Sequence, residues 1–192
     1  MTATGPTVAG GMIRGYVSVL ERRGLLASVR EAVPERAREV IDHPPFPLAW
    51  VETAVLAELM DATGRLHGRE TVKDISLETA RTKAGPILLP FMRTLLSLWG
   101  ATPHSLFKHL QRLVAVQARG LNVSYAPETP SSGTVELSYP PGHAANDHVF
   151  ASWEGAFHFI FDVCGVKGTV DRSEVSDGGQ RARIGIRWEA GR

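Results

Sequence analysis

The spacing of apolar residues changes along this chain, and those changes constrain the fold more than any other feature. From Ile13 to Arg119 the apolar residues recur at helical spacing. After Gly120 they alternate, as they do in strands. The strand patterns cover 121–125, 134–139, 166–170 and 183–188, and a helical, aromatic-rich pattern covers 148–164. The C-terminal half is therefore predicted to run β-β-α-β-β.

Turn residues indicate that the strands are antiparallel. Pro127, Pro130 and Gly133 separate the first two strand patterns, and Asp177-Gly178-Gly179 separates the last two. We therefore predict an α+β fold in which an N-terminal helical part packs on a small antiparallel sheet. With 192 residues, 43% of them hydrophobic, the chain is expected to form one domain over 13–190, after a flexible, glycine-containing leader over 1–12.

Charge gives no reason to expect a nucleic acid or an anionic membrane as partner, because 21 basic and 20 acidic residues leave a formal net charge of +1. The most hydrophobic stretch, Ala84–Trp99, is interrupted by Pro86, Pro90 and Arg93, so no membrane span is expected. A single cysteine, Cys164, excludes an intramolecular disulfide and fits a reducing compartment. The cytoplasm is the predicted location.

Several short motifs carry a resemblance over nearly the whole chain. They are Ile13–Leu20, the aromatic-proline segment Phe46–Trp50, the helix that ends at Gly120 before a strand, and the terminal Ile184–Trp188. With them the chain resembles an uncharacterised family of roughly 200 residues with many paralogous copies in myxobacteria. That family is similar in layout to heme-nitric-oxide-binding and vinyl-reductase-like sensor domains. The resemblance implies a sensor-like fold and no established reaction.

The resemblance also implies where a heme would be held. Heme-binding relatives carry a histidine on the helix before the hairpin and a Tyr-x-Ser-x-Arg motif after it. The matching residues here are His109 and Tyr139-Pro-Pro-Gly-His143. Tyr139 fits, but Pro141 replaces the serine and His143 replaces the arginine, so the donors for heme propionates are largely missing. No cofactor is the expected state, and heme held by His109, Tyr139 and His143 is the alternative.

A metal site is not predicted. His104 and His109 are five residues apart, as are His143 and His148, so neither pair shares a helix face. Vinyl-reductase-like relatives can hold zinc with cysteines near the C-terminus, but 172–183 contains none here.

Glu154, His158 and Asp162 recur at every fourth position and place a histidine between two carboxylates on one helix face. Such a group could raise the histidine pKa and serve acid-base catalysis, with His158 and Glu154 as catalytic residues. The same spacing is typical of the solvent face of an amphipathic helix, which we favour because no nucleophile is identifiable nearby. Cys164 is predicted to be a small, buried, unreactive side chain.

Aromatic residues suggest an apolar pocket between the helices and the sheet, with a packed core as the alternative. The predicted lining is Trp50, Phe91, Trp99, Phe107, Trp153 and Phe157. Without a catalytic set, the leading hypothesis is a non-catalytic sensory or regulatory module that binds a small apolar ligand or a protein partner. A heme-based gas sensor and an acid-base enzyme centred on His158 are the alternatives. A homodimer is a further expectation, since sensor domains commonly pair through exposed helices, although no heptad run indicates it.

Overall fold

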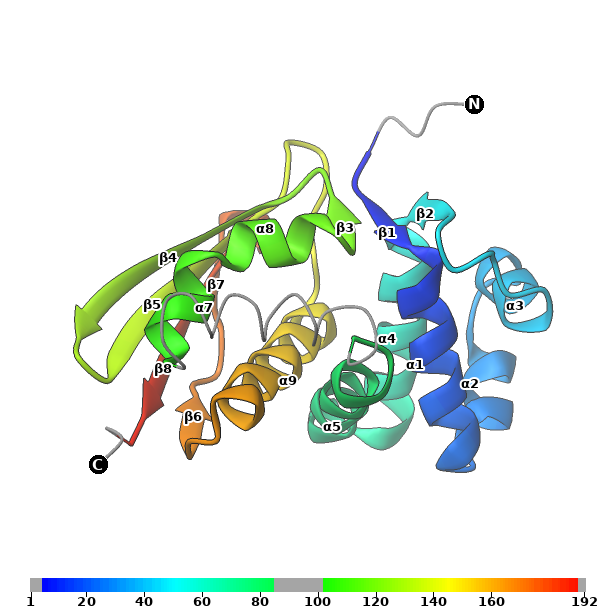
Figure 1. The fold of residues 1–192 in the computed structure, drawn as a ribbon. Coiled ribbons are helices and arrows are strands. Elements are labelled where there is room, and N and C mark those ends of the chain that lie inside the picture. The colour runs from blue at the N-terminus through cyan, green and yellow to red at the C-terminus, as the bar shows by residue number, and fades with distance from the viewer. Residues whose placement is uncertain (1–4, 85–101, 190–192) are drawn as a thin grey trace.

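The computed structural model describes residues 5–84 and 102–189, and it confirms the predicted α+β fold (Figure 1). The N-terminal helices are α1 (Gly10–Arg22), α2 (Leu26–Ala32), α3 (Glu35–Asp42), α4 (Thr53–His67) and α5 (Arg69–Thr79), which continues as a π-helical turn, Ala80–Ala84. The helices after the gap are α7 (Pro103–Lys108), α8 (Leu110–Ala115) and α9 (Asp147–Cys164).

The larger sheet contains the predicted C-terminal strands. Its members are β4 (Asn122–Thr129), β5 (Ser132–Ser138), β6 (Gly168–Val170), β7 (Glu174–Ser176) and β8 (Arg181–Trp188). All pairs are antiparallel, in the order β4-β5-β8-β6, and β7 also pairs with β8. Strand β7 is an addition to the predicted β-β-α-β-β order. It is only three residues long, Glu174-Val175-Ser176, which is too short for an alternating pattern to be recognised in the sequence.

A second, three-stranded sheet joins distant parts of the chain. Strand β1 (Thr7–Ala9) pairs with β2 (Trp50–Glu52) on one side and with β3 (Ala118–Arg119) on the other. The guanidinium of Arg119 lies 3.7 Å from the ring centroid of Trp50 across this sheet. Residues 7–9 therefore form a strand, although the sequence predicted a flexible leader over 1–12. Backbone pairing holds Thr7–Ala9 in place although their side chains are small.

Local signals account for the ends of the long central helix. The Asn146 side chain accepts a hydrogen bond from the Val149 N–H at 3.0 Å, which caps the N-terminus of α9. At the C-terminus Gly165 adopts the left-handed conformation, with φ of 66°, that favours glycine.

Two hydrophobic cores meet along α9. One core lies between the larger sheet and α7, α8 and α9, and the other lies among α1 to α5 and the N-terminal half of α9. Figure 1 shows the sheet on one side, the N-terminal helices on the other, and α9 and α5 between them. Helix α9 is consequently buried on most of its circumference and offers no solvent-exposed face along its whole length.

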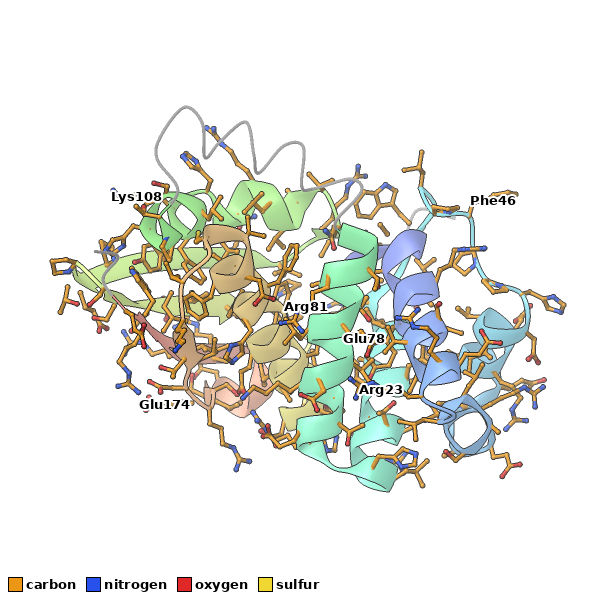
Figure 2. All side chains as sticks on the ribbon, turned by 60° about the horizontal axis from the view of Figure 1, so that its bottom comes forward. Arg23, Phe46, Glu78, Arg81, Lys108 and Glu174 are labelled. Atoms are coloured by element: carbon orange, nitrogen blue, oxygen red, sulfur yellow. The ribbon has the colours of Figure 1, made fainter. Side chains whose placement is uncertain are left out.

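Side chains at the surface connect α1 to α5. Arg22 and Arg23 donate hydrogen bonds to Glu78 at 2.8 and 2.9 Å, and Figure 2 shows Arg23 beside Glu78 between the two helices. Figure 2 also shows Phe46 on the loop between α3 and β2, where it projects into solvent.

Candidate ligand site

A cavity of about 160 Å³ lies where the two cores meet. Its wall takes residues from the N-terminal core, including Val8, Leu56 and Met60, and from the sheet-side core, including Leu113 and Ile160. Most of the lining is aliphatic or aromatic. The cavity is thus an apolar space walled by both halves of the fold.

The cavity volume corresponds to a small organic molecule. An engineered, apolar cavity of ~150 Å³ in another protein stays dry and binds benzene. A cavity of similar size and lining here can hold a single ring or a short aliphatic chain.

The described wall contains no charged side chain, but it contains three buried hydroxyl groups. Tyr16 of α1 and Ser76 and Thr79 of α5 are 1%, 7% and 2% exposed. Burial raises the pKa of the Tyr16 phenol above its ordinary value, and the nearby Thr63 hydroxyl opposes that rise to a smaller extent. Tyr16 is therefore a neutral phenol throughout the physiological pH range.

Polar contacts fix α5 against α9 beside the cavity. Arg69 donates two hydrogen bonds to the Glu154 carboxylate, at 2.5 and 2.9 Å, and a third to Asp147 at 3.0 Å. The Ser173 N–H donates a further bond to Glu154 at 2.7 Å. Burial by itself would raise the pKa of Glu154, but the bonds from Arg69 and Ser173 outweigh it and lower that pKa below its ordinary value.

The sequence favoured a solvent-exposed helix face for Glu154, His158 and Asp162, and this prediction is wrong for Glu154. Its side chain is 1% exposed and paired with Arg69, because α5 packs against this side of α9. His158 is half-buried, and burial together with the charge of Lys73 lowers its pKa. Asp162 instead accepts a hydrogen bond from Arg81 at 2.7 Å. The neighbouring carboxylates thus fail to raise the histidine pKa, and His158 does not line the cavity.

The predicted pocket residues are partly brought together. Trp153 and Phe157 line the cavity. Phe107 is buried in the sheet-side core, where its ring centroid is 6.0 Å from that of Phe157. Trp50 lies on the smaller sheet under Arg119 and does not reach the cavity. The remaining two, Phe91 and Trp99, lie outside the described residues.

The residues predicted for heme lie apart from the cavity. His109 is half-buried at the junction of α7 and α8 and is not in the cavity wall. The Tyr139 hydroxyl accepts a hydrogen bond from the Trp153 indole N–H at 3.1 Å, and burial raises the pKa of Tyr139. Tyr139 and His143 border a separate, more polar hollow of about 300 Å³.

The histidines considered for a metal have other partners. His104 contacts the Tyr125 hydroxyl through Nδ1, and its Nε2 lies 2.9 Å from the Thr129 carbonyl oxygen, which accepts its hydrogen bond. His148 lies 3.1 Å from the Asp61 carboxylate. Within residues 5–84 and 102–189, no group of three histidine, cysteine, aspartate or glutamate side chains could hold a metal ion.

Cys164 lies at the end of α9, half-buried against the sheet-side core. Burial raises the pKa of its thiol to about 11. The thiol is protonated at neutral pH and hence a weak nucleophile, which agrees with the predicted unreactive role.

Sequence reasoning missed the three hydroxyls in the wall. A signal existed in α5, where Val72, Ile75, Ser76 and Thr79 occupy one buried face. Small polar residues at positions of an apolar stripe are candidates for a polar point in a pocket. Tyr16 gave no such signal, because a tyrosine in an apolar stripe is common in cores.

Comparison with solved structures identifies the architecture. The chain has the fold of the H-NOX domains. An Fe(II) unliganded H-NOX mutant from K. algicida matches with a TM-score of 0.69 and 10% identity, over 95% of this chain and 97% of that one. A structure from a study of heme distortion in the H-NOX family matches with 0.67 and 10% identity, over 96% of each chain.

An oxygen-binding H-NOX domain related to soluble guanylate cyclases gives a TM-score of 0.63, with 10% identity over 95% of each chain. No family model and no curated protein matches the chain. The predicted distant similarity to heme-nitric-oxide-binding domains is confirmed at the level of fold. The similarities to vinyl-reductase-like domains and to a myxobacterial family stay predictions.

The cavity does not fit the heme that the fold implies. No histidine or cysteine lies in the described wall, nor does any arginine or lysine that could pair with a propionate. Residues 85–101 contain no histidine, cysteine or tyrosine in their sequence.

In residues 5–84 and 102–189, no helix is long and apolar enough to cross a membrane.

Proposed function

We propose that this chain is a non-catalytic sensory module that binds a small apolar ligand in the cavity between its two cores. The observation that carries the proposal is the position of the cavity, because its wall joins α1, α4 and α5 to α8 and α9. A ligand that fills this space contacts both halves of the fold at once. The H-NOX fold supports a sensory role.

Ligand binding would act through the packing of α5 on α9. These two helices form the most extensive contact between elements that belong to different halves, and both contribute to the cavity wall. A ligand that binds one arrangement of the helices better than another shifts the population toward it. We propose that the resulting change at the surface is passed to a protein partner in the cytoplasm, or to a second copy of the chain.

The test is native mass spectrometry of the purified protein together with thermal unfolding in the presence of benzene and toluene. A ligand at one hundred times its Kd stabilises the folded state by about 2.7 kcal/mol. For a chain of this size that corresponds to a rise in Tm of roughly 5–10 °C.

Two variants make the test specific. Ala156→Leu adds methylenes inside the cavity and should abolish the rise in Tm, since Ala156 lies in the wall. Ala115→Leu makes the same change at an exposed position of α8 and should preserve it. Equal responses in both variants, or no response in the unmodified protein, would exclude ligand binding in this cavity.

Heme-based gas sensing is the second candidate, and the fold of the H-NOX neighbours favours it. An ultraviolet-visible spectrum of protein purified from a heme-sufficient host separates the two. A Soret band that moves on replacement of His109 would establish a heme sensor in place of the apolar-ligand sensor. A colourless protein whose Tm rises in the presence of toluene would establish the apolar-ligand sensor in place of the heme sensor.

A further inference from the structure

The outer edge of the smaller sheet has backbone groups without partners. Strand β2 ends the order β2-β1-β3, and Figure 1 shows it at the periphery of the molecule. The Ala49 C=O accepts a hydrogen bond at 2.7 Å from the backbone flanking β1, and the Thr53 N–H donates one at 3.0 Å. Because such bonds alternate, Val51 also faces β1, whereas the N–H groups of Trp50 and Glu52 and the Trp50 C=O point outward. None of these three groups forms a hydrogen bond within residues 5–84 and 102–189.

The loop that leads into β2 exposes two large apolar side chains. Phe46 and Leu48 are each 84% exposed, and Figure 2 shows Phe46 projecting away from the helices. Single apolar side chains are common on protein surfaces, but two large ones close together are typical of a contact surface. This apolar loop, residues 44–48, lies next to the unpaired edge of β2 in the chain, so the two features form one surface.

Backbone contacts hold the apolar loop in place. The Pro47 C=O accepts a hydrogen bond from the Gly11 N–H at 2.9 Å. The Arg14 guanidinium donates to the carbonyl oxygens of residues 44 and 45, at 3.3 and 3.4 Å. Three of the residues in 44–47 are prolines, which restrict the backbone further. A surface that is already ordered loses little conformational entropy when it binds.

We propose that two copies of the chain associate across a two-fold axis, through the outer edge of β2 and the apolar loop. In an antiparallel pair centred on Trp50, its N–H and C=O bond to the C=O and N–H of Trp50 in the second copy. A residue that offers one donor and one acceptor on the same side is complementary to itself, which favours a second copy as the partner. The two three-stranded sheets would then form one continuous sheet.

Charges on the face of the sheet fit the same arrangement. Glu52 and Arg119 both lie opposite Thr7 in the strand register, so their side chains share one face. Neither forms an ion pair with another described residue, and Arg119 covers the Trp50 ring at 3.7 Å. In the two-fold pair, Glu52 of the second copy is a diagonal neighbour of Trp50, about 7–8 Å away and within reach of a long side chain. The Arg119 guanidinium would thereby gain a carboxylate partner.

The antiparallel direction also gives the apolar loop a place to pack. The loop precedes β2 and helix α4 follows it, so the loop of one copy lies beside the start of α4 in the other. Ala54, in the first turn of α4, is exposed and small. Leu48 can therefore be covered there without displacing a large side chain. The contact does not involve the ligand cavity, so its test needs no ligand.

Sedimentation velocity of the purified full chain, over a dilution series from high to low micromolar protein, tests the proposal. We expect a dimer at the high end that dissociates on dilution. Leu48→Ser removes one apolar side chain from each copy, and since each loss costs about tenfold, the dimer Kd should rise about a hundredfold. Leu66→Ser makes the same substitution at the far end of α4, where Leu66 is 48% exposed, and should leave the Kd unchanged.

A second variant blocks the edge of the strand. Glu52 has a φ of −55°, which proline can adopt, and its outward N–H makes no hydrogen bond within the described chain. Glu52→Pro should therefore keep the circular dichroism spectrum of the unmodified protein and yet stay monomeric, because proline on an edge strand prevents pairing. Leu48→Ser changes only an exposed side chain and decides the question if Glu52→Pro does not fold.

Two results would overturn the proposal. A protein that stays monomeric at the highest concentration would leave the β2 edge to a strand of a different protein. A dimer that persists unchanged in both Leu48→Ser and Glu52→Pro would have to form through another surface. Hydrogen exchange gives an independent measure, since the Trp50 amide should exchange more slowly in the dimer than in the diluted monomer.

Discussion

Removal of the Arg69 guanidinium should destabilise the fold strongly, because it leaves the buried Glu154 carboxylate without its counter-charge. The Glu154 side chain is 1% exposed and that of Arg69 is 15% exposed. Breaking a buried ion pair by removing one partner costs about 3–5 kcal/mol. Arg69 keeps some contact with solvent, so we expect Arg69→Met to lower the free energy of unfolding by about 3 kcal/mol, the lower end of that range.

A matched control exists on the same pair of elements. Arg81, just beyond α5, pairs with Asp162 of α9 at 2.7 Å, and their side chains are 53% and 41% exposed; Figure 2 shows Arg81 in this position. Exposed pairs contribute about 0–1 kcal/mol. Arg81→Met should therefore cost about 1 kcal/mol or less.

Urea denaturation followed by circular dichroism at pH 7 measures both variants, with the free energy taken by linear extrapolation. The loss in Arg69→Met corresponds to a fall in Tm of roughly 6–12 °C. The double variant Arg69→Met/Glu154→Leu should recover much of it, since no buried charge remains. Equal losses in Arg69→Met and Arg81→Met would refute the role given to burial.

Three further outcomes are expected. Because Glu154 has a lowered folded-state pKa, its contribution to stability is complete above the unfolded value of 4.5 and is lost as pH falls through the lower folded value. The free energy of unfolding of Glu154→Gln, measured as pH is lowered, should lack this loss. A loss of stability in acid equal to that of the unmodified protein would contradict the prediction. Gly155→Ala would place a Cβ 2.1 Å from the Lys73 carbonyl oxygen. Although alanine is the better helix former, overpacking should lower the free energy of unfolding in urea by about 1–3 kcal/mol. A gain in stability would count against close packing of α5 on α9. Cys164, with a thiol pKa of about 11, should react slowly with a disulfide reagent at pH 7 and faster as pH rises; reaction as fast as free cysteine at pH 7 would show that the thiol is not buried.

Local signals in the sequence determined the class of the fold and the order of its main elements. The period of the apolar residues separated helices from strands, since each side chain's direction follows from its own backbone. Asn146 and Gly165 at the ends of α9, and the glycine-containing turns, act within a few residues of chain. The same local reasoning placed Trp153 and Phe157 in a pocket wall.

Only the tertiary structure decided the features that depend on contacts between distant segments. The smaller sheet pairs strands of two or three residues, too short for a period to appear in the sequence. Glu154 looked like a surface carboxylate until Arg69, 85 residues away, was found beside it. The cavity arises where the two cores meet imperfectly. Such a mismatch is a property of packing in three dimensions, and periodicity along one chain carries no record of it.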